Sequence, residues 1–198
     1  MLVIGVTGGI GTGKSEVSRA LEGHGAIIID ADRVGHSIYL LDTDGWKEVV
    51  ATFGEDVLQE DRQVDRRKLG AIVFGDPEAL AKLNAITHPK IRQKISDLTE
   101  EERHKGSKVV VVEAAILIEA NWIDLVDEVW VATSDPNAVV RRIQERNNLP
   151  EDQIRSRIAS QMTHDERVRH ATVIIENNGD LEGLREQVAH LWEIRVGG

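Results

Sequence analysis

The stretch that decides the fold of this chain is TGGIGTGKSE, residues Thr7-Gly8-Gly9-Ile10-Gly11-Thr12-Gly13-Lys14-Ser15-Glu16. Gly8, four further residues and then Gly13-Lys14-Ser15 match the Walker A pattern GxxxxGK[ST]. An apolar run precedes the loop, and apolar residues at helical spacing follow it. Such a strand–loop–helix unit binds phosphate, because the loop N–H groups and the positive N-terminal end of the helix point at one place.

Three residues at the end of the loop have separate expected roles. Lys14 is expected to bridge the β- and γ-phosphates of a nucleotide, and the Ser15 hydroxyl to bind Mg²⁺. Glu16 is unusual there, since a carboxylate ~6 Å from a phosphate charge, at an effective dielectric of ~20, is repelled by up to ~3 kcal/mol. The first helical turn nevertheless suits a carboxylate, and Arg19 follows three residues on. We predict that Glu16 turns outward and gives the phosphates at most its backbone N–H.

The composition limits the class of protein and its partners. The chain has 198 residues, a net charge of −10 and 41% hydrophobic residues, which suits one compact, water-soluble domain. It contains no cysteine, which excludes disulfides and thiolate metal sites, and no apolar run long enough to span a membrane. The acidic balance favours an anionic small molecule over nucleic acid as the ligand. We expect a cytoplasmic protein with no membrane partner, as a monomer or a weak homo-oligomer.

Five short runs rich in β-branched residues predict the strands of one sheet. Because each run is continuously apolar, the strands are expected to be parallel and buried on both faces. The runs are Leu2–Val6, Ala26–Ile29, Val109–Val112, Val129–Thr133 and Thr172–Ile175.

Helical patterns fill the intervals and predict a three-layer α/β fold. Ser134-Asp135-Pro136 offers a cap with proline at the first helical position, and Asp180 is placed to cap the last helix. Between the second and third predicted strands, Asp76-Pro77 and His88-Pro89 each predict a helix start. We expect a core at about residues 1–32, 108–140 and 164–198, an inserted helical lobe at about 33–107, and a two-helix lid at about 141–163 joined at residues 147–150.

Polar residues follow every predicted strand and should meet at one edge of the sheet. Asp30 and Asp32 follow the second strand; one of them is expected to cap a turn, and we favour Asp32 as the base that orients an attacking hydroxyl. Glu113 follows four valines, as in a Walker B strand, and is expected to bind Mg²⁺. Asn177 follows the last strand and is a candidate contact of the nucleotide.

The arginines after residue 140 and His88 each have two interpretations, one functional and one structural. Arg142 and Arg146 lie one turn apart and Arg157 lies on the next predicted helix, so we expect at least one to neutralise phosphate charge, while another pairs with an acid. A solvated helical surface is the plainer reading of this cluster. For His88, a substrate contact in the inserted lobe and a plain position at a helix N-terminus carry equal weight.

The chain resembles the dephospho-coenzyme A kinases nearly from end to end. The resemblance rests on TGGIGTGKS, IIDADRVGH, LNAITHPKIR, VVVVEAAILIEANW, RRIQERNNL, RIASQM and VIIENNG, in the order and spacing of that family. The EAAILIEANW…DEVWV stretch is also close to the kinase domain of bifunctional coenzyme A synthase.

The resemblance implies a P-loop NTPase fold with a five-stranded parallel sheet, and transfer of the ATP γ-phosphate to the 3′-hydroxyl of dephospho-CoA with Mg²⁺ as cofactor. The residues that it assigns fall into three groups. Catalysis is implied for Asp32, Lys14 and Arg142. Nucleotide binding is implied for Gly9, Gly11, Thr12, Gly13, Lys14, Ser15, Glu16, Arg146 and Asn177. Substrate binding is implied for Asp30, Asp32, His88, Arg92, Glu113, Leu117 and Arg157, with the metal on Ser15 and Glu113.

Two departures from the family pattern keep alternatives open. Many relatives have aspartate and a nearby proline where this chain has Glu113-Ala114-Ala115, and a second small hydroxyl residue where it has Glu16. The alternatives are another P-loop small-molecule kinase of the nucleoside monophosphate or shikimate type, a nucleotide-driven switch, and a binding-only pseudokinase. A GTP switch usually carries an NKxD motif, and the sequence has none.

Overall fold

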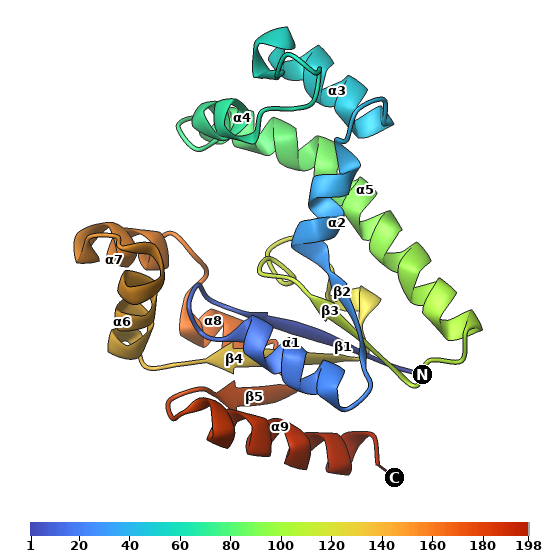
Figure 1. Ribbon diagram of the computed structural model, residues 1–198, viewed down its shortest axis with the longest axis vertical. Helices are drawn as coiled ribbons and strands as arrows, with labels where there is room; N and C mark the ends of the chain where they lie inside the picture. Colours follow the sequence, from blue (N-terminus) through green and yellow to red (C-terminus); the bar gives the residue numbers. More distant parts are fainter. Residues whose placement is uncertain (198) are drawn as a thin grey trace. The chain divides into compact units, whose positions relative to one another are not determined.

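The chain divides into two units, which we describe one at a time (Figure 1). The structure is a computed structural model that describes residues 1–197; Gly198, the last residue of the predicted core, lies outside the described residues. The sheet unit contains Met1–Asp30 and the chain from Thr99 onward, and the helical unit is Ala31–Leu98.

A parallel sheet forms the centre of the sheet unit. Within residues 1–197 it has five strands in the order β2-β3-β1-β4-β5, and every neighbouring pair is parallel. The strands are β1 Leu2–Gly8, β2 Ile27–Asp30, β3 Val109–Glu113, β4 Glu128–Thr133 and β5 Val173–Glu176. All five predicted strands are confirmed. β1 continues past its predicted end, since Thr7 and Gly8 still pair with β4.

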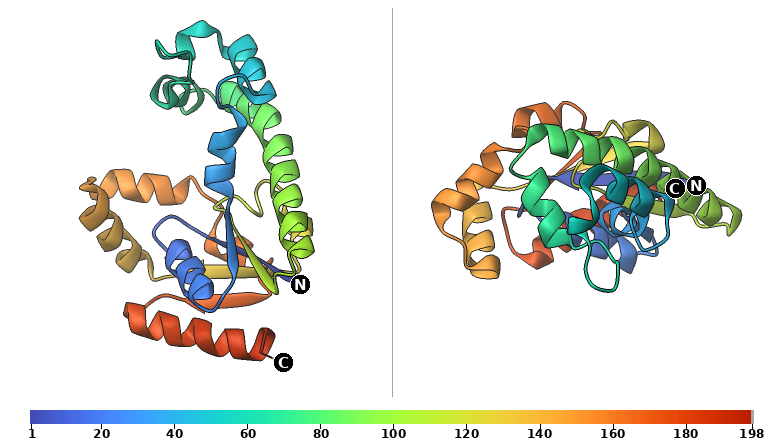
Figure 2. Two further views of the ribbon diagram at one scale, coloured as in Figure 1. Left: turned by 45° about the vertical axis from the view of Figure 1, so that its right-hand side comes forward. Right: turned by 90° about the horizontal axis from the view of Figure 1, so that it is seen from above.

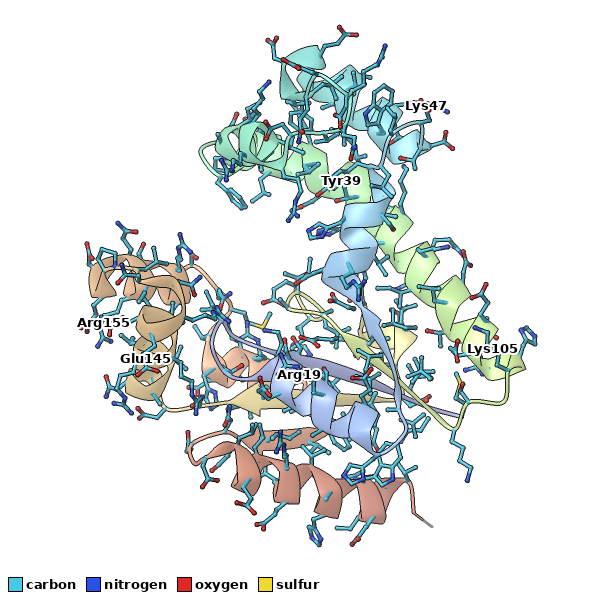
Figure 3. The ribbon with its side chains drawn as sticks, viewed as in Figure 1. Arg19, Tyr39, Lys47, Lys105, Glu145 and Arg155 are labelled. Carbon is cyan, nitrogen blue, oxygen red and sulfur yellow. The ribbon has the colours of Figure 1, made fainter. Side chains whose placement is uncertain are left out.

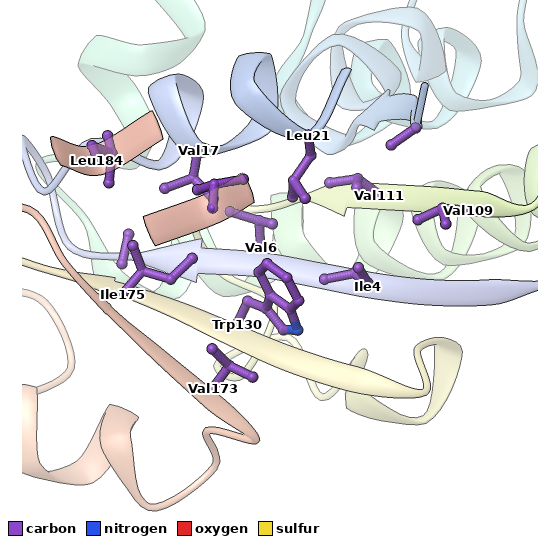
Figure 4. Close-up of a cluster of buried hydrophobic side chains, with 13 residues drawn as sticks. Ile4, Val6, Val17, Leu21, Val109, Val111, Trp130, Val173, Ile175 and Leu184 are labelled. Atoms are coloured by element: carbon purple, nitrogen blue, oxygen red, sulfur yellow. The ribbon is translucent and has the colours of Figure 1, made fainter. Parts of the chain in front are cut away.

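One face of the sheet is covered by α1, Lys14–Gly23, and α9, Leu181–Arg195, which lie side by side (Figures 1 and 2). Their buried residues pack on alternate residues of the strands around Trp130, which is fully buried (Figure 4). The Trp130 indole Nε1–H donates to Glu128 at 2.8 Å, so burial of the ring leaves its polar atom satisfied. As predicted, Asp180 caps α9 by accepting from the Gly183 N–H.

The opposite face of the sheet is covered by two other segments. The segment after β3 contains η2, Ile123–Leu125, and buries Leu117 and Trp122. The short helix α8, His164–Val168, lies against β4. Segments therefore cover both faces of the sheet, which confirms the predicted α/β fold with its parallel sheet.

The two helices predicted for the lid form a hairpin in the sheet unit, and the first begins five residues before its predicted start. Its helices are α6, Pro136–Asn147, and α7, Glu151–Ala159. Asp135 caps α6 and accepts from two N–H groups of its first turn, with Pro136 at the first helical position as predicted. Asn148 takes a left-handed conformation at φ 50° and ends α6. Val139, Val140, Ile143 and Ile154 form the buried contact between the two helices.

The helical unit has a small core of its own around Trp46. Its elements are α2 Ala31–Ile38, α3 Asp44–Phe53, η1 Glu55–Val57, α4 Arg66–Val73 and the start of α5, Pro77–His104. The Trp46 ring packs with Val49, Val57 and Leu69, and its Nε1–H donates to the Arg62 carbonyl at 2.8 Å. Tyr39, labelled in Figure 3, packs at the edge of this core.

The two helices predicted at Asp76-Pro77 and His88-Pro89 are one helix, so the second predicted start is wrong. α5 runs from Pro77 to His104 with Pro89 inside it. Proline removes one N–H bond to the carbonyl four residues back, which here belongs to the exposed residue Ala85. Ile91 and Ile95 are buried on the far side of the proline, and their packing keeps the helix continuous.

Candidate active site

The loop between β1 and α1 depends on glycine at Gly13. This residue is the N-cap of α1 and has a φ of 101°, a conformation that side chains strongly disfavour. A Cβ at Gly13 would lie 2.2 Å from the Asn177 Nδ2 atom. That amide donates to the Thr12 carbonyl at 2.9 Å, so Asn177 supports the loop from the end of β5.

The Lys14 side chain folds back over the start of the loop. Its ammonium lies 3.0 Å from the Gly8 carbonyl oxygen and 3.4 Å from that of Gly9. The strand end therefore holds a positive charge beside the N-terminal end of α1. Both features favour an anion at this place.

The two residues predicted to bind metal meet directly. The Ser15 hydroxyl donates to Glu113 Oε1 at 2.7 Å, although the residues are far apart in the chain. Glu113 ends β3, and its register partners are Val6 on β1 and Asp30 on β2. A hydroxyl and neighbouring carboxylates offer the hard oxygen ligands that Mg²⁺ prefers.

The oxygen atoms of Ser15 and Glu113 fit a metal ion that takes most of its ligands from phosphate and water. Among the residues that the structure describes, no group of three or more His, Cys, Asp or Glu side chains is arranged to hold a metal ion. Mg²⁺ commonly takes one or two protein oxygens, with phosphates and water completing its octahedron. The Ser15–Glu113 pair fits that pattern.

An open cavity of about 540 Å³ lies between the loop, α6 and the start of α9. Eight of the residues predicted for the nucleotide or for catalysis line it: Gly11, Gly13, Lys14, Ser15, Glu16, Arg142, Arg146 and Asn177. Ile143 and Leu181 also line it and were not predicted as site residues. They add apolar surface next to the charged loop, a combination suited to a ligand with a phosphate end and a flat apolar end.

Arg142 is held by main-chain and side-chain oxygens. Its guanidinium donates to the Ser134 hydroxyl at 3.0 Å and to the Asn177 carbonyl at 2.8 Å. It therefore joins the base of α6 to the end of β5 while it lines the cavity. Arg146 lies one turn further on, is exposed, and donates to the Asn147 side chain at 2.9 Å.

Three of the residues predicted on the loop and the lid lie outside this cavity. Gly9 and Thr12 line a second, smaller cavity of about 290 Å³ between the loop, β4 and the end of α7. Arg157 is exposed on α7 and is not among the residues that line either cavity.

Glu16 pairs with Arg19, as predicted. The Arg19 guanidinium, labelled on α1 in Figure 3, donates to Glu16 Oε1. Both side chains are more than a third exposed, so the pair adds little to stability. Its effect is to hold the carboxylate charge against a neighbouring positive charge.

Three predicted residues belong to the helical unit. Asp32 is exposed in the first turn of α2, two residues after β2 ends. His88 and Arg92 are half-buried on α5 and lie four residues apart, which places them on one face of that helix. Burial lowers the pKa of the His88 imidazole and favours its neutral form.

Leu117 belongs to the core and offers no side-chain surface to a ligand. It is fully buried after β3, and its Cδ2 atom would lie only 2.6 Å from a Cβ added at Gly5. We therefore leave its side chain out of the proposed site. The sequence does not indicate that Leu117 is buried. Leu117 and Ile118 follow the strand with no periodic pattern that separates buried positions from exposed ones.

Gln161 also belongs to the site, although no sequence pattern indicates it. The Ile10 N–H, inside the phosphate loop, donates to Gln161 Oε1 at 2.9 Å. RIASQM was one of the stretches that carried the family resemblance, but nothing in its pattern indicates that its glutamine reaches a loop so distant in the chain.

The fold and the site define a P-loop kinase. Residues 2–183 match the family model described as dephospho-CoA kinase. The chain is 43% identical over 197 residues to a dephospho-CoA kinase of Dehalococcoides mccartyi, covering 99% of this chain and 98% of that protein. The chain thus belongs to the dephospho-CoA kinase family.

Solved structures agree with this assignment at the level of the fold. The dephospho-CoA kinase from Campylobacter jejuni superposes with a TM-score of 0.75 at 27% identity, covering 98% of both chains. A shikimate kinase from Bacteroides thetaiotaomicron superposes with a TM-score of 0.59 at 12% identity, covering 98% of this chain and 97% of that one, and shares the fold alone. In the described part of the chain, every helix is too short or too polar to cross a membrane.

Proposed function

We propose that this protein transfers the γ-phosphate of ATP to the 3′-hydroxyl of dephospho-CoA, giving CoA and ADP, the last step of CoA biosynthesis. The observation that carries the chemistry is the contact of Ser15 with Glu113 in the first turn of α1, next in the chain to Lys14, whose ammonium lies on the Gly8 carbonyl. Family membership supports the choice of dephospho-CoA as the acceptor.

The loop binds the triphosphate in this proposal. Backbone N–H groups from Gly11 to Glu16, at the start of α1, donate to the phosphate oxygens, and the Lys14 ammonium moves from the Gly8 carbonyl to the β- and γ-phosphates. The cavity beside α6 takes the rest of the nucleotide, with Arg142, Arg146 and Asn177 at its wall. Ser15 and Glu113 would hold Mg²⁺, which would neutralise phosphate charge.

Asp32 is the proposed base. A carboxylate that accepts the proton of the 3′-hydroxyl orients this hydroxyl as nucleophile, and phosphoryl transfer needs little more from a base. Its place in the chain supports this assignment, because it follows by two residues Asp30, which ends β2 and is the register partner of Glu113. Asp30, His88, Arg92 and Arg157 are proposed contacts of the acceptor.

We also propose a domain organisation, a location, an oligomeric state and a class of partners for this chain. We treat the chain as one kinase domain with a helical substrate lobe and a lid, acting in the cytoplasm as a monomer or a weak homo-oligomer. Its proposed partners are small molecules, with neither nucleic acid nor membrane among them. Light scattering after size-exclusion chromatography measures the oligomeric state directly.

One assay separates the leading function from its alternatives. Purified protein is mixed with ATP, Mg²⁺ and an acceptor panel of dephospho-CoA, nucleoside monophosphates and shikimate, and ADP release is followed. We expect turnover with dephospho-CoA and a product phosphorylated at the 3′ position. Turnover with another acceptor instead favours a different small-molecule kinase. ATP binding without any transfer favours a pseudokinase or a switch, and either result rejects the proposal.

A further inference from the structure

The exit of the lid touches the phosphate loop. Helix α7 ends at Ala159, and Gln161 follows within the same turn, with its N–H on the Ile158 carbonyl. The Gln161 side chain reaches back to the loop, where its Oε1 accepts from the Ile10 N–H at 2.9 Å. Its orientation is fixed by chemistry, because an N–H donor must face the oxygen of the carboxamide.

The entrance of the lid also reaches the loop, through a different route. Arg142, in the second turn of α6, donates to the Asn177 carbonyl, and the Asn177 side chain donates to the Thr12 carbonyl. Both ends of the lid are thus joined by hydrogen bonds to the loop, at residues two apart. A shift of either lid helix changes the positions of Ile10 and Thr12 unless these bonds break.

The contact at Gln161 has a rigid neighbour. Arg167 on α8 is 6% exposed and donates to Glu119 at 3.0 Å. A Cβ at Gly9 would lie 3.4 Å from Gln161 Oε1 and 3.6 Å from Arg167 Nη1, so both side chains pack against this part of the loop. The Gln161 carboxamide therefore lies at Gly9, as the buried Arg167 guanidinium does, and bonds the backbone of the next residue, Ile10.

We propose that Gln161 is a positioning residue that couples the lid to the phosphate loop, so that the loop is held in its ATP-binding shape by the segment that closes the helical hairpin. The proposal rests on the proposed kinase function. Gln161 acts through Ile10 and touches neither ATP nor acceptor itself. Its effect should appear in ATP affinity and in the mobility of the Ile10 amide, while the KM for the acceptor stays unchanged.

The test compares three variants of the full-length chain. Gln161→Met keeps the length of the side chain and removes the acceptor, Gln161→Glu keeps an acceptor at the same reach, and Gln153→Met makes the same change at an exposed residue of α7. Two quantities are measured without turnover: hydrogen exchange of the Ile10 amide in the nucleotide-free protein, by NMR, and the dissociation constant of ATP, by calorimetry.

For Gln161→Met we expect faster Ile10 exchange and an ATP dissociation constant raised about five-fold, the worth of one hydrogen bond. Gln161→Glu should keep the slow exchange of Ile10, and Gln153→Met should match the wild type in both quantities. If Gln161→Met leaves both quantities within two-fold of the wild type, or if Gln153→Met changes them as much, the proposal is overturned. Should Gln161→Met fail to fold, loss of Ile10 protection in folded Gln161→Glu overturns it equally.

These measurements also separate this proposal from the proposed function. ATP binding and amide exchange need no acceptor, so the Gln161 variants remain interpretable whatever the wild type phosphorylates. A wild type that binds ATP but does not phosphorylate dephospho-CoA rejects the proposed function and leaves the coupling intact.

Discussion

The Ser15 hydroxyl donates to Glu113 Oε1 at 2.7 Å, which joins the first helical turn after the phosphate loop to the end of the neighbouring strand β3. The glutamate carboxyl reaches the hydroxyl although its side chain is one methylene longer than that of the aspartate found in many relatives. The added length therefore does not separate the acid from the serine.

Glu113→Gln tests the metal role of this pair. The amide oxygen still accepts from Ser15, but the negative charge is lost, so we expect the apparent affinity for Mg²⁺ to fall about 10- to 100-fold. Titration of turnover against Mg²⁺ measures it, with Glu101→Gln as the control at an exposed residue. An unchanged Mg²⁺ midpoint would remove Glu113 from the metal site.

Asp32→Asn tests the proposed base. Asparagine keeps the size of the side chain but cannot accept the hydroxyl proton, so we expect turnover to fall roughly 10²- to 10⁴-fold while ATP binding stays unchanged. Steady-state rates and calorimetry measure the two effects. Asp56→Asn, an exposed change in the same unit, is the control and should keep the wild-type rate. A near-normal rate in Asp32→Asn would assign the base elsewhere.

Gly13→Ala tests the geometry of the loop. The new methyl group would lie 2.2 Å from Asn177 Nδ2 at a φ of 101°, so either the loop strains or the Asn177 bond to Thr12 breaks. We expect the free energy of unfolding to fall by about 1–3 kcal/mol, together with a loss of ATP affinity. Urea denaturation and calorimetry measure these effects.

Gly23→Ala is the matched control for Gly13→Ala. Gly23 ends the same helix, and a Cβ there meets no atom within 4 Å. Alanine favours the helix, so the free energy of unfolding should be unchanged or raised by up to about 1 kcal/mol. Equal losses in the two variants would show that the contact at Gly13 has no special weight.

Glu16→Thr tests whether the carboxylate acts on the nucleotide. Because Glu16 pairs with Arg19, most of its charge is balanced, and we expect ATP affinity to stay unchanged or to rise modestly. Calorimetric titration with ATP measures it, and Glu22→Thr, an exposed position on the same helix, is the control. A large loss of affinity in Glu16→Thr alone would assign the carboxylate a direct role.

His88 predicts a pH dependence of stability. Burial lowers its pKa in the folded protein, so below the ordinary value of about 6.5 the unfolded chain binds a proton more readily than the folded one. The contribution of His88 to stability is therefore complete above about pH 6.5 and decreases as the pH falls from there through the lowered folded pKa. The difference between wild type and His88→Gln, from urea denaturation at each pH, isolates it among the seven histidines. A difference that is constant between pH 5 and 7.5 contradicts the prediction.

The sequence allowed the sheet and the phosphate loop to be predicted because both have local signals. Val109–Val112 is apolar and β-branched at every position, which is typical of a strand buried on both faces, and Gly13-Lys14-Ser15 has the spacing of a phosphate loop. The cap at Asp135 could also be predicted, since it needs only its own neighbours.

What could not be predicted depends on contacts between distant segments. Pro89 is a valid helix start by itself, and it is the packing of Ile91 and Ile95 that makes it an interior residue of α5. Gln161 gains its role from Ile10, which lies 151 positions away in the chain. Arg142 was predicted by its charge, but its bonds to Ser134 and Asn177 depend on where β4 and β5 end.

The tryptophans divide between the two units in a way that gives each its own optical signal. Trp46 is the one tryptophan within residues 31–98, where it is buried and donates to Arg62, whereas Trp130 is buried in the sheet. Trp46→Phe should therefore remove the tryptophan fluorescence of the helical unit and leave that of the sheet unit. Subtracting the two unfolding curves would then show whether the lobe proposed to bind the acceptor melts together with the nucleotide-binding core or before it.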